Sequence, residues 1–370
     1  MKVGARTNQG LMISNVYVQV PVAARMWSRA LLLVLLTALY ADAEDAQDLD
    51  AQLRVGHSIN IFTRYGYLSI SMKVVERNET NSNWIFREPT VDIFNDVKPL
   101  AEHPTRSAKR VIFNGDFHME FCDNLIQLLQ AYFRNYSFEK LDRPWRAFSG
   151  SWQADNIAKN MGINSSFVHG DYCYVLLRLS RTRDTVKLSP IPNNVNLSDI
   201  VAREIDNIKV GDIDSVWTFI RKYGSHYINS YVTGNSLYQV YVYKKPTYDE
   251  IKHRLRSVGI SNMSPAELGT YFGPWHAQHI GKIKVASGNK TVEGWASKNL
   301  RVQYYFFTYP SLLKIHDSVN LMTILNDILK NEALIELEMR ALTPAFKDPA
   351  KRKWFEEVLT NFLHLYETNL

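Results

Sequence analysis

Cysteine is scarce in this sequence, since only Cys122 and Cys173 occur among 370 residues. The sequence has no CxxC pair, no HExxH motif and no paired Cys/His spacing. It therefore gives no support for a structural zinc site or a zincin-type protease, and we expect neither a metal nor a cofactor. In an oxidising compartment, two cysteines favour one disulfide between Cys122 and Cys173. The alternative is two separate buried thiols.

Long apolar runs are also missing. Residues 30–40 (ALLLVLLTALY) form an apolar run that falls well short of the roughly 20 residues needed to span a bilayer. Two arginines precede it and Ala41-Asp42-Ala43 follows, a pattern typical of a cleaved secretory signal within residues 1–43. Met26 is a conventional start for that signal, which leaves residues 1–25 as an upstream extension. We therefore expect a secreted, extracellular protein, either free or associated with the cell surface or matrix.

Excess charge is small. The whole chain carries +6, and the segment 1–43 contributes Lys2, Arg6, Arg25 and Arg29 against Asp42, so a mature chain carries +3. This weak excess gives no argument for nucleic acid as a partner. A hydrophobic content of 46% and an aromatic content of 12% favour a sheet-rich globular protein over a disordered chain. No fixed-period repeat is present.

Asn-x-Ser/Thr sequons support secretion, because this acceptor pattern is glycosylated in the secretory pathway. The candidate glycosylation sites are Asn78, Asn135, Asn164, Asn196, Asn262 and Asn289. Pro265 directly after its sequon makes Asn262 the weakest candidate, and Asn135 lies beside an apolar helix that is expected to bury it.

Residues 212–243 are the stretch around which the chain is organised. A capping aspartate, apolar residues at helical spacing and a terminating Gly224 predict a helix after Asp212. A strand rich in Tyr, Val and Ile follows, with a break at Thr233-Gly234-Asn235. We expect a wide sheet that bends at this break.

Other elements follow from periodicity and from turn residues. We expect strands in 55–75, 84–94, 172–180 and 300–309, the last being the last strong strand of the chain. We expect helices over 121–133, 197–208, 317–342 and 350–366.

The junction of that helix and strand carries a family resemblance. The residues are Trp217, Tyr223-Gly224-Ser225-His226-Tyr227 and Gly234, and they resemble the signature of the membrane-attack-complex/perforin (MACPF) family. The family usually has Thr at Ser225 and a second glycine at Asn235. The resemblance implies an α+β fold with a bent, twisted four-stranded antiparallel sheet flanked by two helical clusters. The MACPF-like domain would span 44–315, and 316–370 would be a C-terminal helical segment packing on it.

The segments Phe121–Asn124 and Glu139–Phe148 resemble one secreted family member of insects in particular. That resemblance implies a developmental signalling glycoprotein, with extracellular protein partners in the Torso receptor tyrosine kinase pathway and its secreted ligand. It implies no enzymatic activity.

In pore-forming members the two clusters, here a first around residues 121–133 and a second at 244–287, refold into membrane-spanning hairpins, so a pore-forming effector is the alternative function. The second cluster, residues 244–287, is rich in cations, and its apolar residues Ile251, Leu255 and Val258 are spaced for a helix. A lipid-spanning strand needs alternation instead, so we expect a non-lytic protein. Lys252, Arg254 and Arg256 are candidates for peripheral contact with anionic lipids or glycans; the alternative is a solvated helix face.

His226 is also considered as a catalytic residue. A hydrolase would need a nucleophile and an orienting acid beside it. Ser225 is adjacent in the chain, but consecutive strand residues point to opposite faces, so we expect the two side chains to lie apart. The simpler interpretation is a buried, hydrogen-bonded histidine at a helix–strand junction, with Tyr223, Gly224 and Tyr227 packed around it.

Overall fold

The computed structural model describes residues 54–62, 91–95, 97–100, 117–147, 154–192, 195–259, 262–304, 306–316, 318–330 and 332–369. The chain divides into residues 1–51 and 52–370, and every described residue belongs to the second unit. The predicted signal segment and the sequon at Asn78 lie outside the described residues, as do most of the strands expected in 55–90.

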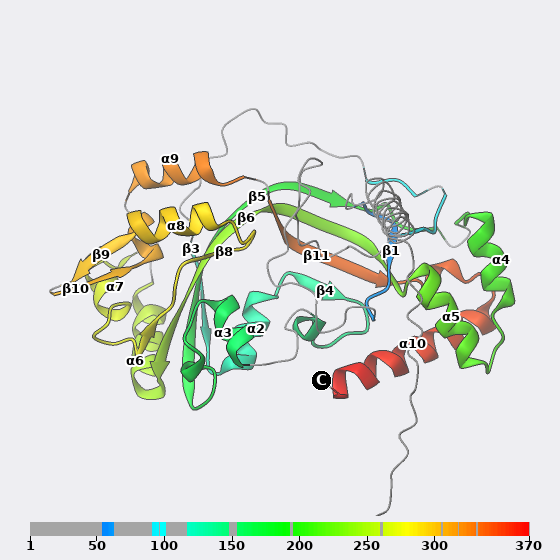
Figure 1. Ribbon diagram of the computed structural model, residues 1–370, viewed down its shortest axis with the longest axis horizontal. Coiled ribbons are helices and arrows are strands. Elements are labelled where there is room, and N and C mark those ends of the chain that lie inside the picture. Colours follow the sequence, from blue (N-terminus) through cyan, green and yellow to red (C-terminus); the bar gives the residue numbers. More distant parts are fainter. Residues whose placement is uncertain are drawn as a thin grey trace, which may run out of the picture. The chain divides into compact units, whose positions relative to one another are not determined.

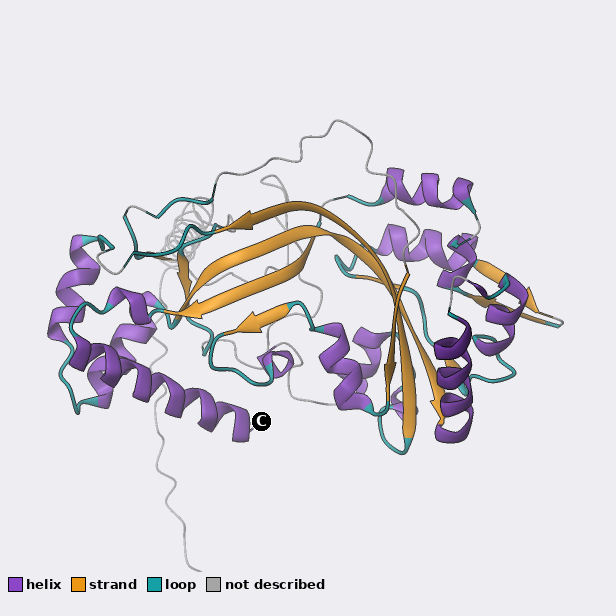
Figure 2. Cartoon of the chain, turned by 180° about the vertical axis from the view of Figure 1, so that it is seen from behind, coloured by secondary structure: helices purple, strands orange, loops and turns teal. Residues whose placement is uncertain are grey.

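The fold is α+β, built on a curved, mostly antiparallel sheet (Figures 1 and 2). Its longest strands are β5 (Tyr172–Lys187) and β6 (His226–Lys244), which pair over nearly their whole length. The predicted count of four strands is not confirmed, since nine strands of the described chain join this sheet and the β4–β11 pair is parallel. The other seven are β1 (His57–Ile59), β2 (Val91–Asp92), β3 (Phe117–Cys122), β4 (Tyr136–Phe138), β7 (His279–Ile280), β8 (Lys284–Val285) and β11 (Ala333–Ala341).

Alternation along β5 and β6 divides the core between the two faces of the sheet. Tyr174 and Leu176 pack on one face, while their neighbours Val175 and Leu177 pack on the other. The first face is covered by α2 (Leu125–Tyr132), α3 (Ala154–Met161), α4 (Asp199–Asn207), α5 (Ile213–Tyr223) and α10 (Pro349–Asn369). The second is covered by α6 (Lys245–Val258), α7 (Pro265–Tyr271), α8 (Lys290–Asn299) and α9 (Val319–Ile328). Short 3-10 turns occur at Pro144–Ala147, Ser165–Phe167, Leu312–Ile315 and Thr343–Ala345.

The C-terminal region differs from its prediction. The segment 317–342 was expected to be one helix, but α9 ends at Ile328 and β11 follows, antiparallel to β6. The residues from Ile335 onward alternate apolar and polar, and pairing with β6 buries one side of that alternation. A domain boundary at residue 315 would therefore separate a sheet strand from its sheet.

The strand expected over 300–309 is a hairpin. Arg301–Tyr304 (β9) and Phe307–Pro310 (β10) pair with each other in a separate two-stranded sheet. The prediction that this stretch is the last strong strand of the chain is therefore wrong, because β11 follows it and pairs with β6 in the main sheet. The predicted helix 350–366 corresponds to α10.

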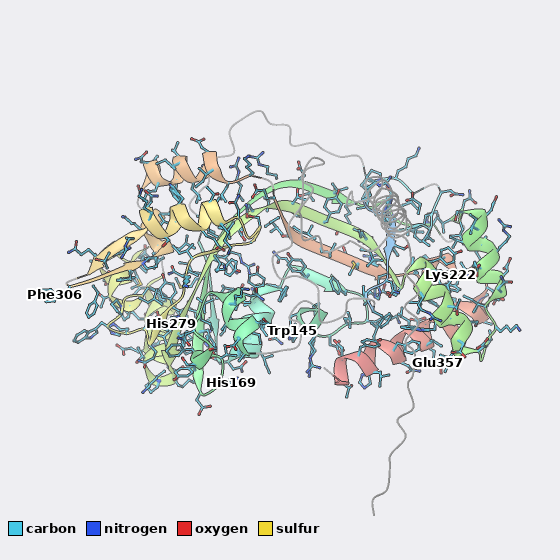
Figure 3. The ribbon with its side chains drawn as sticks, viewed as in Figure 1. Trp145, His169, Lys222, His279, Phe306 and Glu357 are labelled. Carbon is cyan, nitrogen blue, oxygen red and sulfur yellow. The ribbon has the colours of Figure 1, made fainter. Side chains whose placement is uncertain are left out.

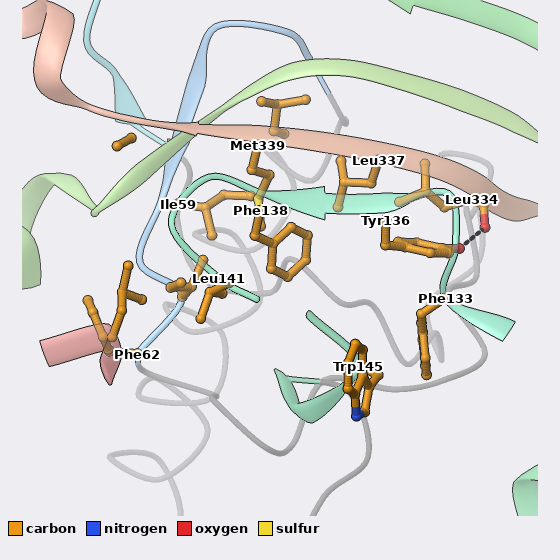
Figure 4. Packing of buried hydrophobic residues seen from close by; sticks show 14 of the residues in the cluster. Ile59, Phe62, Phe133, Tyr136, Phe138, Leu141, Trp145, Leu334, Leu337 and Met339 are labelled. Atoms are coloured by element: carbon orange, nitrogen blue, oxygen red, sulfur yellow. Dashed lines mark hydrogen bonds between the residues drawn. The ribbon is translucent and has the colours of Figure 1, made fainter. Parts of the chain in front are cut away.

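Strand β4 brings the segment after α2 into the main sheet (Figure 4). Tyr136 lies opposite Leu337 of β11, and its hydroxyl donates to the carbonyl of Leu334 over 2.6 Å. Phe138 packs in the same buried cluster as Met339. The first helical cluster is thus joined to the sheet by backbone pairing as well as by apolar packing.

Candidate functional site

The junction between α5 and β6 forms as the sequence predicts. The Asp212 carboxylate accepts a hydrogen bond from the amide of Asp214 at the start of α5. Gly224 ends the helix with φ of 92°, and a Cβ there would lie 2.8 Å from the backbone carbon and oxygen of Ile59. Gly224 therefore holds a backbone conformation that is closed to residues with side chains.

Ser225 and His226 are in direct contact, contrary to the prediction from strand alternation. Ser225 lies in the bend before β6, so the alternation rule does not apply to it. Its Oγ is 3.0 Å from Nδ1 of His226, accepts from the amide of Ile61 over 3.3 Å, and lies 3.3 Å from the carbonyl oxygen of Ile59, which competes with Nδ1 for the single hydroxyl proton. On the other side, Nε2 of His226 is 3.0 Å from the carbonyl oxygen of Glu139. Because a carbonyl can only accept, Nε2 carries the proton and Nδ1 accepts from Ser225.

This pair does not form a catalytic site in the folded state. Both residues have 0% exposed surface, so a substrate cannot reach the serine oxygen without the fold opening. The group that orients His226 is the Glu139 backbone carbonyl, whereas a triad uses a carboxylate that stabilises the imidazolium. What the contact does is join the signature to the segment after β4.

We expect acid to destabilise the fold through His226. Burial lowers the pKa of His226 to about 4, whereas the unfolded residue titrates near 6.5. Between these values the unfolded state binds the extra proton, so the free energy of unfolding falls as the pH drops through that window, by about 3 kcal/mol in total. Urea unfolding at pH 7.5 and pH 4.5 checks this. A His226→Gln variant should lose less stability between the two pH values than the wild type, and equal losses would contradict the assignment.

The aromatic residues of the signature have packing roles. Trp217 packs against Phe362 of α10, with ring centroids 4.7 Å apart and the ring planes tilted by 44°. Tyr223 lies 5.3 Å from Phe219 within α5, and Tyr227 meets Phe94 edge-on. These contacts tie the helix of the signature to the C-terminal helix and the β2 region.

Gly234 marks the bend of the sheet. β6 runs through it without a break, and the irregularity falls on its partner β5, between Thr182 and Asp184. A Cβ on Gly234 would lie 2.0 Å from the carbonyl oxygen of Arg181. Close approach of β5, rather than an unusual φ, therefore requires glycine here.

Asn235 occupies the position where the MACPF signature usually has a second glycine, and its side chain makes specific contacts. It is 1% exposed, its amide nitrogen donates to Oγ of Ser287 over 3.2 Å, and its side-chain oxygen accepts from the Ser287 amide over 3.4 Å. Buried Gln239 likewise bonds backbone groups of Gly281, Pro310 and Leu312. An amide side chain inside an apolar strand is the sequence signal that could have identified both.

The predicted disulfide is wrong, because both cysteines are free and buried. Cys122 lies opposite Tyr174 across the β3–β5 ladder, so it is offset from Cys173 by one position. Consecutive strand residues face opposite ways, and the two thiols accordingly pack in the two separate cores. Burial raises the pKa of Cys122 to about 12, which leaves it an unreactive thiol.

The sequons differ in exposure. Asn135, Asn164, Asn196 and Asn262 are exposed, so the expected burial of Asn135 is wrong. Asn289 is half-buried, its oxygen caps α8, and its nitrogen, the atom that would carry the sugar, donates to Glu332 over 3.0 Å. Exposure therefore favours the four exposed sites over Asn289 as glycan acceptors.

The three candidate cations on α6 do not form one patch. Lys252 is only 19% exposed and pairs with Asp123 over 3.0 Å, while its ammonium also lies over the ring of Tyr248. This hydrogen bond lowers the pKa of Asp123. Arg254 faces Glu267 at 3.6 Å, and Arg256 is exposed. Lys252 therefore acts as a structural contact to the first cluster.

Few features suit a small ligand. A hollow of about 140 Å³ is lined by Ile191, Pro192, Thr343, Pro344 and Arg352, and it is smaller than common ligand pockets. Within the described ranges, no three His, Cys, Asp or Glu side chains are grouped so that they could hold a metal ion. Across the same residues, no helix combines the length and apolarity needed to cross a bilayer.

No family model matches the sequence, and no curated protein matches it. Similar solved structures include a protein of Bacteroides thetaiotaomicron with a MAC/Perforin domain, at 10% identity and a TM-score of 0.39. GNIP1Aa from Chromobacterium piscinae is similar at 10% identity and 0.45, and the vertebrate-specific, perforin-like membrane protein Astrotactin-2 at 13% and 0.34. The matches cover 83%, 84% and 82% of this chain, and 59%, 57% and 99% of the three structures in turn.

Proposed function

We propose that this chain is a secreted, glycosylated, non-lytic member of the MACPF family that acts in extracellular developmental signalling. The residues 121–124 and 139–148 resemble the insect Torso-like protein. The partners we propose are extracellular proteins of the Torso receptor tyrosine kinase pathway. No enzymatic activity is proposed, since the Ser225–His226 pair is fully buried.

The main support for a non-lytic function is the packing of α6 against the sheet. Tyr248, Ile251 and Leu255 lie on one helix face and are 0–5% exposed, packed in the core of the second sheet face. Extending this segment into a lipid-facing strand would give up that packing. It would also place Asp249 and His253 on the same strand face as Ile251 and Leu255, where a charged or polar side chain facing lipid is destabilising.

The C-terminal part of the second cluster, residues 278–286, is also hydrogen-bonded to the sheet. Backbone amides of Gln278, Gly281 and Ala286 donate to carbonyls of β6 over 2.8 Å each. Asn235 adds its contact with Ser287 at the bend itself. Refolding this cluster would therefore require breaking pairing along the central strand.

The first cluster is tied down separately. β4 pairs with β11, and Glu139 accepts from the amide of Ala341 through its carboxylate over 2.8 Å. The backbone oxygen of the same residue bonds His226. Since β4 already belongs to the sheet, unfolding this cluster would remove a strand from the fold. Both clusters thus support a role as a fixed scaffold rather than as a refolding pore.

A liposome-leakage assay with the purified mature protein tests the proposal. We expect no dye release above background from anionic or neutral vesicles, because neither cluster can extend without loss of sheet pairing. A known perforin-type pore-former serves as the positive control. Concentration-dependent release would favour the pore-forming alternative instead. Cross-linking and pull-down from the extracellular matrix around the source cells would then identify the protein partner.

A further inference from the structure

The β9–β10 hairpin has a rigidly held base. Gln239 of the central strand donates to the carbonyl of Pro310 over 2.9 Å and accepts from the amide of Leu312 over 2.8 Å. Across the base, the Ser311 amide donates to the carbonyl of Leu300 over 2.7 Å. Tyr309 is buried, and its hydroxyl donates to the carbonyl of Gly269 in α7 over 3.2 Å. The hairpin is thus fixed to β6 and α7.

The tip of this hairpin is aromatic and exposed. Phe306 is 98% exposed and Phe307 is 58% exposed, and Figure 3 places Phe306 at the outer end, away from the sheet. Trp275, in the turn after α7, is 80% exposed. That turn adjoins the hairpin, because a Cβ on Gly273 would lie 3.1 Å from the Tyr309 hydroxyl oxygen. Aromatic groups held in water at this exposure indicate an interaction site.

From residue 268 to residue 316 the sequence contains one acidic residue, Glu293, which pairs with Lys284 and Lys290. The segments 268–292 and 294–316 contain no aspartate or glutamate, and both carry lysine or arginine. Lys298 and Arg301, at the end of α8 and the start of β9, are exposed. A cationic surround matches an anionic surface, and a convex aromatic tip fits a fluid lipid interface better than a flat protein face.

We propose that the β9–β10 hairpin anchors the protein to anionic membranes by inserting Phe306 and Phe307 at the level of the lipid headgroups. Pairing between β9 and β10 satisfies backbone groups of the inserted tip. The insertion is shallow and leaves α6 and α7 folded, so it differs from pore formation. It goes beyond the proposed signalling function and does not depend on it. It also assigns the lipid contact to the hairpin instead of Lys252, because Lys252 forms an ion pair with Asp123.

Vesicle flotation with the purified mature protein tests this proposal, using phosphatidylcholine vesicles with and without phosphatidylserine. The double variant Phe306→Ser, Phe307→Ser should bind anionic vesicles at least about tenfold more weakly than the wild type. The matched control is Ile200→Ser, which removes a side chain of α4 that is 61% exposed. That control should bind as the wild type does, and Phe306→Trp should retain binding.

The salt dependence of vesicle binding distinguishes apolar insertion from charge attraction. Wild-type binding should weaken at high salt but stay above that of the double variant, because buried apolar area is not screened. Circular dichroism should show all variants folded, since the replaced side chains are exposed. Unchanged vesicle binding by the double variant would overturn the proposal. So would normal vesicle binding combined with loss of a protein complex, which would assign the tip to a protein pocket.

Discussion

Replacement of Gly234 by alanine is expected to abolish secretion of the folded protein. The added Cβ would lie 2.0 Å from the carbonyl oxygen of Arg181, and backbone atoms cannot yield as a flexible side chain can. Relief would require separating β5 from β6 at the bend, where the two strands already shift register. We expect a loss of more than about 4 kcal/mol, a large part of the 5–15 kcal/mol that stabilises a typical domain.

The measurement is the amount of protein secreted, followed by thermal unfolding of any that appears. Gly294→Ala is the matched control, because this glycine lies in α8 with no heavy atom within 4 Å of a built Cβ. That change should be neutral or stabilise by up to about 1 kcal/mol through helix propensity. Wild-type yield and melting temperature for Gly234→Ala would show that the bend does not depend on close strand approach.

Gly224→Val is expected to have the second-largest effect, again as failure to fold and secrete. Two penalties act together here. With φ of 92°, a β-branched residue is strained, and its Cβ would lie 2.8 Å from backbone atoms of Ile59. Moving Ile59 away would also break its hydrogen bond from the amide of Ser225, which is 2.9 Å long. The junction that holds Ser225 and His226 would then open.

Gly211 separates these two penalties. Its φ of 91° matches that of Gly224, but no heavy atom lies within 4 Å of its built Cβ. Gly211→Ala should therefore show only the conformational cost, about 1–2 kcal/mol, with secretion retained. Gly224→Ala should be markedly worse than Gly211→Ala in the same secretion and unfolding assays. Equal losses for the two alanine variants would mean that the contact with Ile59 contributes nothing.

Local sequence signals determined the elements around the junction. The capping Asp212, the helical spacing after it and the terminating Gly224 are interactions within a few residues, and α5 forms where they predict. The same holds for α2 and α4, and for most of the long strands β5 and β6. The need for glycine at 224 also followed from local sequence, because few other residue types permit a backbone that ends a helix and starts a strand.

Only the tertiary structure decided which side chains meet. The segment 335–341 was predicted to be part of a helix, but it pairs with β6 as a strand. Strand pairing here outweighs helix propensity. The register of β3 against β5, set by long-range pairing, put Cys122 and Cys173 on opposite faces and excluded their disulfide. Lys252 looked like a free surface cation, yet packing of α6 brought it to Asp123 of the first cluster. These outcomes depend on contacts between residues far apart in the chain, which local pattern does not encode.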